Sequence, residues 1–343
     1  MPNIKHAEIC YIIAFPDPTD EKSTPPEQIR GLKDAPYFQP VDIDVRTLGQ
    51  VEVQAGGVQV SVLRQRYDNQ IQMVDCRFQM SDVFNASVIQ QREVIERNLR
   101  ERFIPVEYLA SGLFEEYAIL LLTHLRGTPD KFIDNNAVQI GRFVRSQREV
   151  LNQSELEEIM SSRIRYSTKD LTVVDWEGAV IIADNGDFQS DIELLKIGNY
   201  QLLRYRMLDE VMEKMLDTIN ESFIVNKRRP RATRGAIREI VQHRLEVMLD
   251  FERTDQNLLL IGDWYTAKLY KAIRDELYLE EWKNTIRGKL DNLESIVQTI
   301  KDNLSISWEN LLDRVQLALW ILMLFGYLYL YFLDAGWLII PPK

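Results

Sequence analysis

The chain has 343 residues, of which 45% are hydrophobic and 27% charged, as in a globular protein that folds around its own core. Its formal net charge of −11 would repel phosphates, which argues against general affinity for nucleic acid and excludes DNA as an expected partner. The two cysteines, Cys10 and Cys76, form neither a disulfide framework nor a zinc-binding spacing. They are expected to be buried free thiols in a reduced compartment.

The N-terminal third of the chain predicts strands. Residues 7–15 (AEICYIIAF) predict a buried strand, and residues 16–40 contain six of the twelve prolines, which predicts an irregular loop. Further strand-like runs follow at residues 41–53, 58–66 and 70–80.

Turn and cap signals separate these runs. Gly56-Gly57 and Asp68-Asn69 are typical of two-residue hairpin turns. Ser81 is expected to be the N-cap of a helix that ends near Arg102.

The middle of the chain mixes helix and strand signals. Residues 117–125 (YAILLLTHL) are compatible with a strand or a helix, and helices are expected at 131–147 and 154–162. Two strands are expected at 170–176 and 178–184, closed by a turn at Asn185-Gly186. Residues 1–186 are therefore predicted to form an α/β or α+β domain.

From residue 187 to 312 the pattern predicts a helical hairpin followed by a long stalk. Apolar residues recur at helical spacing between 208 and 223, a second helix is expected at 235–251, and a third at 255–312. The third carries a coiled-coil-like seam with steps of three or four residues: Ile286, Leu290, Leu293, Val297, Ile300 and Leu304. The seam is interpreted either as packing within the chain or as a homo-oligomer contact, and a combination of both is favoured.

The C-terminal region predicts one transmembrane helix over residues 313–335, followed by a short tail at 336–343. Nineteen uncharged residues run from Val315 to Leu333, enough to cross a hydrocarbon layer about 30 Å thick. The alternative is a helix buried in a protein core. The residues expected in the membrane are Val315, Leu317, Leu319, Trp320, Leu322, Leu324, Phe325, Tyr327, Leu330 and Phe332.

The distribution of basic residues predicts the orientation of this span. Only Lys343 follows it, whereas five basic residues lie within the stretch before it: Lys283, Arg287, Lys289, Lys301 and Arg314. The positive-inside rule then places the bulk of the chain on the cytoplasmic or matrix side. A single span so near the end predicts a tail-anchored, single-pass membrane protein.

A basic run at residues 227–238 stands out in this acidic chain. It is interpreted either as a solvated turn between helices or as a site for an anionic partner, formed by Arg228, Arg229 and Arg231. Helix lengths would place this turn about 60 Å from the membrane, beyond the ~8 Å reach of electrostatic attraction. A soluble acidic protein or an RNA is therefore preferred to lipid headgroups as the partner.

No catalytic, cofactor-binding or metal-binding residues are predicted. The sequence lacks a phosphate-binding loop that ends in Gly-Lys-Ser/Thr, and the three histidines are far apart: His6, His124 and His243. Asp175 and Glu177 flank Trp176 on an expected strand without a visible partner. Arg206 and Asp209 are expected to form a local ion pair on a helix.

Three stretches carry a resemblance to a known family: DLTVVDWEGAVIIAD, LLKIGNYQLLRYRMLDEVMEK, and GDWYTAKLYKAIRDELYLEEWKNTIRGKLDNLESIV leading into the span. From about Tyr166 to Leu333 the chain resembles the yeast and mitochondrial proteins required for meiotic nuclear division and their uncharacterised bacterial relatives. The resemblance implies an α/β domain, a helical stalk, one C-terminal span and homo-oligomers. It also implies a role like that of the mitochondrial members, which support organellar translation, and it supplies no catalytic residues.

More distantly, the layout of stalk and span resembles the CorA magnesium channels. Those have two spans and a Gly-Met-Asn signature, whereas here Phe325-Gly326-Tyr327 stands in a single span. The leading hypothesis is therefore a membrane-anchored, homo-oligomeric scaffold or interaction protein. The alternatives are a CorA-like ion-conducting oligomer and an enzyme with a site in the N-terminal domain.

Overall fold

The computed structural model describes residues 7–17, 25, 27–28, 43–123, 125, 127–147, 151–219, 241–242, 244–249, 251–252 and 264–334, with the side chains of 300–311 left out. The chain divides into two compact units. Unit 1 comprises residues 1–217 and 245–287, and unit 2 comprises 218–244 and 288–343. The compact α/β unit thus extends beyond the expected boundary at residue 186, because the helix that follows packs on its sheet.

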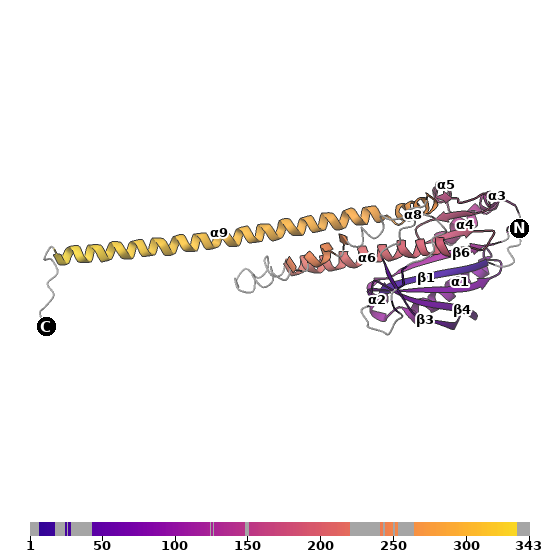
Figure 1. Ribbon diagram of the computed structural model, residues 1–343, viewed down its shortest axis with the longest axis horizontal. Helices are drawn as coiled ribbons and strands as arrows, with labels where there is room; N and C mark the ends of the chain where they lie inside the picture. Colours follow the sequence, from indigo (N-terminus) through magenta and orange to yellow (C-terminus); the bar gives the residue numbers. More distant parts are fainter. Residues whose placement is uncertain are drawn as a thin grey trace. The chain divides into compact units, whose positions relative to one another are not determined.

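Unit 1 is built around one nine-stranded sheet with the order β2-β3-β4-β5-β1-β6-β9-β8-β7 (Figure 1). Neighbouring strands are antiparallel except for the parallel pair of β6 and β9. The α/β class is therefore confirmed, with a mixed sheet. The strands are β1 Ala7–Pro16, β2 Glu27–Gln28, β3 Asp44–Ala55, β4 Val58–Tyr67, β5 Ile71–Met80, β6 Glu115–Leu122, β7 Arg163–Ile164, β8 Leu171–Val174 and β9 Gly178–Ile182.

The two hairpin turns predicted in the first third are confirmed. Gly56 and Gly57 have φ values of 55° and 80°, and Asp68 and Asn69 have values of 47° and 54°. Positive φ at both central residues matches the twist of the flanking strands, so each turn fixes the register of its hairpin. The run from residue 117, which was compatible with either structure, forms strand β6.

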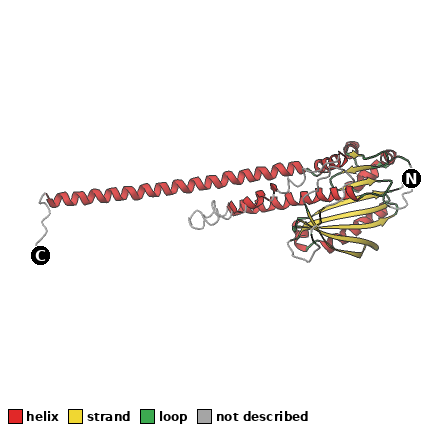
Figure 2. Cartoon of the chain, in the orientation of Figure 1, coloured by secondary structure: helices red, strands yellow, loops and turns green. Residues whose placement is uncertain are grey.

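The helices of the α/β fold begin and end at residues that only partly match the expectations. They are α1 Ala86–Phe103, α2 Val106–Ser111, α3 Pro129–Asn135, α4 Ala137–Val144, α5 Gln153–Ser161, α6 Gln189–Ile219 and α8 Trp264–Glu276 (Figure 2). The N-cap of α1 is Asn85 and not Ser81, because the Asn85 side chain accepts a hydrogen bond from the Ser87 amide. The helix expected over 131–147 is divided at Asn136.

The sheet is covered on both faces. On one face, a single apolar cluster joins strand residues such as Val74 and Cys76 to side chains of α1, α3, α4 and α5. Asp75 lies between Val74 and Cys76 and therefore points to the opposite face, where Lys196 of α6 contacts it. Helix α6 thus covers the second face.

The long third helix is two helices rather than one. Helix α8 ends at Glu276, Tyr278 has a φ of 51°, and α9 then runs unbroken from Leu279 to Asp334. A left-handed residue cannot continue an α-helix, so the chain changes direction there. The expected helix at 235–251 is described only from residue 241, where the described positions up to 252 are helical.

The first part of the predicted seam is already buried within the single chain. Ile286, Leu290, Leu293 and Val297 are each at most 6% exposed. Packing within the chain, one of the two interpretations of this stripe, therefore applies to these four residues. The side chains of Ile300 and Leu304 lie outside the described residues.

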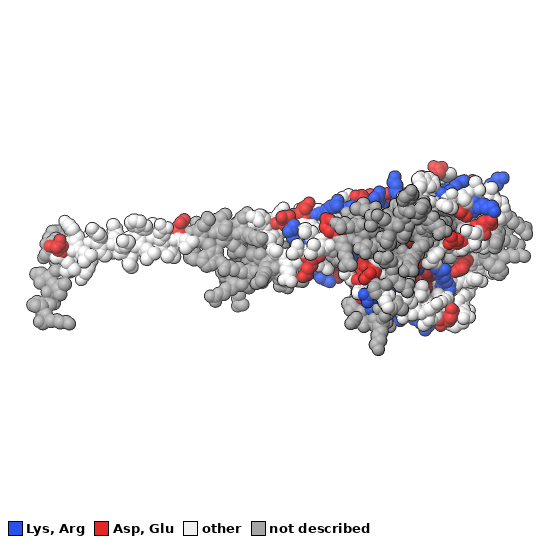
Figure 3. All heavy atoms as spheres, viewed as in Figure 1, with Lys and Arg blue, Asp and Glu red and all other residues white. Residues whose placement is uncertain are grey.

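The last part of α9 is one helix long and apolar enough to cross a membrane. It covers Leu312–Asp334, 23 residues with a mean hydropathy of 1.8, and none of its most apolar stretch is buried in the protein. Nine of the ten residues expected in the membrane are exposed, and Phe332 is half-buried. In Figure 3 this helix is almost entirely white, with charged atoms only near its ends. The alternative of a helix buried in the chain's own core is therefore wrong.

Candidate functional site

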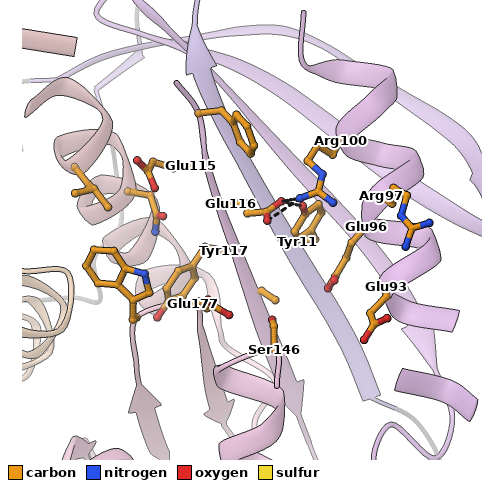
Figure 4. A pocket seen from close by; sticks show the side chains of 15 residues that line it. Tyr11, Glu93, Glu96, Arg97, Arg100, Glu115, Glu116, Tyr117, Ser146 and Glu177 are labelled. Atoms are coloured by element: carbon orange, nitrogen blue, oxygen red, sulfur yellow. Dashed lines mark hydrogen bonds and ion pairs between the residues drawn. The ribbon is translucent and has the colours of Figure 1, made fainter. Parts of the chain in front are cut away.

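The candidate site is a pocket of about 460 Å³ in unit 1 (Figure 4). It lies beside the N-terminal end of β6, because the pairing of β6 with β9 begins only at Ala118. Among the described strands, β1 is therefore the only neighbour of Glu115, Glu116 and Tyr117. Helix α1, the end of α4, helix α6 and the turn between β8 and β9 supply the remaining walls.

The upper wall of the pocket is a hydrogen-bonded group of three residues. The Tyr11 hydroxyl donates to Glu116 Oε2 at 2.5 Å. Arg100 Nη1 lies 2.9 Å and 3.0 Å from the two carboxylate oxygens of Glu116. Tyr11 pairs with Ala118 and Glu116 with Ile13, so Tyr11 and Glu116 are diagonal neighbours on β1 and β6, and the last turn of α1 places Arg100 beside them. The Glu116 carboxylate is thus fully engaged.

The negative charge of Glu96, on α1, is less well balanced by hydrogen-bond donors than that of Glu116. Its Oε1 atom lies 3.0 Å from Nε of Arg92, but the two groups are not aligned as a hydrogen bond, and both atoms are buried. Burial raises the pKa of Glu96 to about 7, with Arg92 opposing and Glu116 adding to the rise. Glu96 therefore exchanges its proton near neutral pH.

Glu115 is held by a partner that the sequence did not indicate. Arg206 of α6 forms an ion pair with Glu115 and donates to the carbonyl oxygens of Phe114 and Gly112, at 2.9 Å and 2.6 Å. The expected local pair of Arg206 with Asp209 is therefore wrong for the arginine. The side chain of Arg206 instead reaches the strand that α6 covers.

The turn between β8 and β9 forms the outer rim. Trp176 and Glu177 lie in this turn and not on a strand, because the hairpin closes with a hydrogen bond from the Asp175 amide to the Gly178 carbonyl oxygen. Trp176 is 42% exposed, and its ring centroid lies 5.5 Å from that of Tyr278.

The two acids that flank Trp176 have different environments. Asp175 is buried and paired with Arg145 at 2.8 Å, whereas Glu177 lines the pocket. Burial raises the pKa of Glu177, and Glu116 and Asp175 add to the rise. Asp175 and Glu177 do not share a site.

A second ionic group lies on the other face of the sheet, away from this pocket. Asp75 Oδ2 is 2.9 Å from Lys196 Nζ and 3.1 Å from Arg77 Nη2, and Lys196 is 3.1 Å from Glu193. The Cys10 thiol donates to Asp75 at 3.3 Å. Both cysteines are buried free thiols, as predicted, and burial raises their pKa values.

The other predicted positions do not join the pocket. Arg228, Arg229 and Arg231 and the three histidines lie outside the described residues. Within the described part of the chain, no group of three or more His, Cys, Asp or Glu side chains is placed to hold a metal ion. The pocket residues were missed because they come from separate strands, helices and a turn. The one local signal was the alternation of acidic and basic residues between 92 and 100.

Together, these features define an α/β unit with a charged pocket, followed by helices that lead to an apolar C-terminal segment. Residues 18–189 match the family described as "Uncharacterized protein MJ0711, N-terminal domain", and the chain belongs to this family.

One relative extends the similarity beyond that domain. The chain is 24% identical over 241 residues to the uncharacterized protein MJ0711 of Methanocaldococcus jannaschii, which covers 70% of this chain and 74% of the relative. The aligned length exceeds the stretch matched by the family. No solved structure matches the chain. The function is therefore argued from the chain's own residues.

Proposed function

We propose that this protein is a membrane-anchored, homo-oligomeric interaction protein, with its α/β unit on the cytoplasmic or matrix side. The observation that carries the proposal is the exposure of Leu312–Asp334, an apolar helix with none of its most apolar stretch buried.

Membrane insertion resolves an unfavourable exposure. In water, each large side chain of this helix would forgo roughly 1.5–3 kcal/mol of burial free energy. Twenty-three residues span about 35 Å as a helix, which matches a hydrocarbon layer about 30 Å thick. Tyr327, Tyr329 and Tyr331 lie towards the far end, where interfacial aromatic residues are favourable.

The orientation and the self-association are further parts of the proposal. The basic residues before the span favour retention of the bulk of the chain on the cytoplasmic side. The apolar repeat continues from the four buried seam residues to Ile300 and Leu304, and a shared membrane confines copies to one plane. The resemblance to the meiotic nuclear division family also favours a homo-oligomer.

Deleting residues 312–343 tests the anchor. The truncated chain should move to the soluble fraction after lysis, whereas a control that lacks only residues 336–343 should stay with the membranes. A truncated chain that sediments with membranes after a high-salt wash would refute the single-anchor proposal.

The topology can be tested separately. A cysteine introduced at the exposed residue Lys169 should be protected from a membrane-impermeant maleimide in intact cells and become reactive after permeabilisation. Labelling in intact cells would reverse the proposed orientation.

The alternatives have distinct signatures. An ion-conducting oligomer requires a continuous wet path between copies of the span and should produce currents in planar bilayers. An enzyme requires turnover that depends on residues of unit 1. Neither signature is expected of a protein that acts only through its partners.

A further inference from the structure

The lining of the charged pocket beside β6 contains more acidic than basic side chains. Its lining contains five glutamates against two arginines, Arg97 and Arg100. Arg100 is engaged by Glu116, and Arg97 is exposed on α1. The glutamates therefore outnumber the arginines in the lining, and one of the two arginines is already held by a glutamate.

Two of the carboxyl groups form aligned ion pairs, and a third, Glu96, has only the misaligned ion pair with Arg92. Glu116 is held by Arg100 and Tyr11, and Glu115 by Arg206. The buried Oε1 atom of Glu96 accepts no hydrogen bond within the described part of the chain.

The remaining carboxyl groups and the rim point to the same space. In Figure 4 the Glu96 and Glu177 side chains point into the pocket from α1 and from the β8–β9 turn. Glu93 and Ser146 lie below them in Figure 4. The half-exposed Trp176 is also part of the lining.

We propose that this pocket binds an organic cation, either a primary amine or a guanidinium group, between Glu96 and Glu177 and against the indole ring of Trp176. The N–H groups of such a cation can donate to the carboxylates of Glu96 and Glu177, which line the pocket, and charged donors form the stronger hydrogen bonds. The face of a tryptophan attracts a cation within about 6 Å.

The shape of the site favours an organic cation over a metal ion. The described acidic side chains form no group of three that converges on one point, as a metal ion would require. A pocket of about 460 Å³ instead has room for an amine with its carbon chain. The amine can belong to a free polyamine or to a lysine or arginine side chain of a peptide.

Calorimetry on the full-length protein in detergent at pH 7.5 and low salt tests the proposal, with spermidine in one arm and an end-blocked Gly-Lys-Gly peptide in the other. Glu177→Gln should weaken binding at least tenfold, and Trp176→Ala about threefold. Glu101→Gln, an exposed residue of the same helix outside the pocket, is the control and should bind like the wild type. Preference for the peptide would assign a protein partner, and preference for spermidine a free amine.

Proton linkage gives a second readout. The groups that face Glu96 are Arg92, Glu93 and Arg100 of α1, Tyr11 of β1, Glu116 of β6, and Glu177 with Ser146. Because the pKa of Glu96 is about 7, a bound cation should displace its proton, and the binding heat at pH 7 should vary with the ionisation enthalpy of the buffer. Glu96→Gln should abolish that dependence.

The outcomes that would overturn the proposal are specific. The first is that neither probe binds at millimolar concentration. The second is that Glu177→Gln leaves binding unchanged, which would place the amine elsewhere on the acidic surface. Neither outcome depends on membrane anchoring. A failure of the proposed anchoring would be seen separately, in the fractionation of the truncated chain.

Discussion

Replacing Lys196 with methionine should strongly destabilise the α/β unit. The Lys196 side chain is 1% exposed, and its ammonium group lies 2.9 Å from Asp75. Methionine retains much of the apolar stem but removes the charge. Asp75, also 1% exposed, would then keep the Cys10 thiol as a neutral donor and Arg77, whose side chain is 34% exposed, as its cationic partner.

The magnitude follows from the ionic contacts of Asp75. Burial alone would raise the pKa of Asp75, but the charges of Lys196 and Arg77 outweigh burial and hold it at about 2, against the usual 3.8. This difference corresponds to about 2 kcal/mol of stabilisation of the ionised form. Removing one partner of a buried pair typically costs ~3–5 kcal/mol, and the remaining Arg77 favours the lower end.

A loss of about 3 kcal/mol should lower the melting temperature by roughly 6–12 °C in a unit of this size. Thermal unfolding of the full-length protein in detergent, followed by near-ultraviolet circular dichroism, measures the shift. The matched control is Lys214→Met, on the same helix but 72% exposed, which should melt within about 3 °C of the wild type.

A second variant separates loss of the ion pair from loss of packing. Asp75→Leu combined with Lys196→Met should recover at least half of the lost stability, because the buried carboxylate is removed together with its buried ammonium partner. The reasoning would be refuted if Lys196→Met melted within 2 °C of the wild type, or if the double variant were no more stable than the single one.

Three further predictions concern other parts of the chain. Gly178→Ala should destabilise unit 1 by about 1–3 kcal/mol in urea unfolding, because its Cβ would lie 2.6 Å from a backbone carbonyl oxygen of β6, whereas Gly49→Ala, with open space around it, should not. Ile300→Asp with Leu304→Asp should lower the particle mass in detergent without changing the melting of unit 1; an unchanged mass would restrict the seam to contacts within the chain. Replacing Arg228, Arg229 and Arg231 with Gln should leave membrane association intact and weaken capture of a soluble anionic partner. The prediction would be contradicted if the soluble part floated with anionic liposomes and this flotation vanished in the Gln variant.

Local chemistry explains which parts of the fold could be predicted. A two-residue hairpin turn requires positive φ, and the glycine pair at 56–57 adopts it without steric cost, so the turn could be recognised without knowledge of the sheet. The break between α8 and α9 at Tyr278 carries no such signal, because a tyrosine seldom adopts a left-handed conformation and here its ring packs against Trp176. A contact over a hundred residues along the chain cannot be read from periodicity.

The pocket was unpredictable for the same reason. Tyr11, Glu96, Glu116 and Glu177 come together only because β6 lies between β1 and β9 in the sheet. The strand order depends on packing of the whole unit, and no spacing in the sequence encodes it. The terminal apolar helix is the opposite case, because nineteen uncharged residues in a row carry the signal by themselves.

The two buried carboxyl groups, Asp75 and Glu96, illustrate how the same chemistry serves structure on one face and a candidate site on the other. Two aligned cations lower the pKa of Asp75, whereas burial with a single misaligned cation raises that of Glu96 to about 7. A raised pKa of a buried carboxyl group beside a pocket, as for Glu96, is typical of functional groups.

These opposite shifts predict two separate pH dependences of stability. Glu96 binds a proton more tightly in the folded chain than at its usual pKa of 4.5, so stability should rise as the pH falls from about 7 towards 4.5, by at most roughly 3 kcal/mol. Asp75 acts in reverse, and its contribution should be lost as the pH falls from 3.8 through 2. Glu276, whose pKa burial also raises to about 7, adds to the first effect, so Glu96→Gln should reduce the rise without abolishing it. Melting temperatures measured from pH 8 down to pH 5 test this prediction. A wild-type protein that became less stable as the pH fell over this range would show that Glu96 stays ionised in the folded chain.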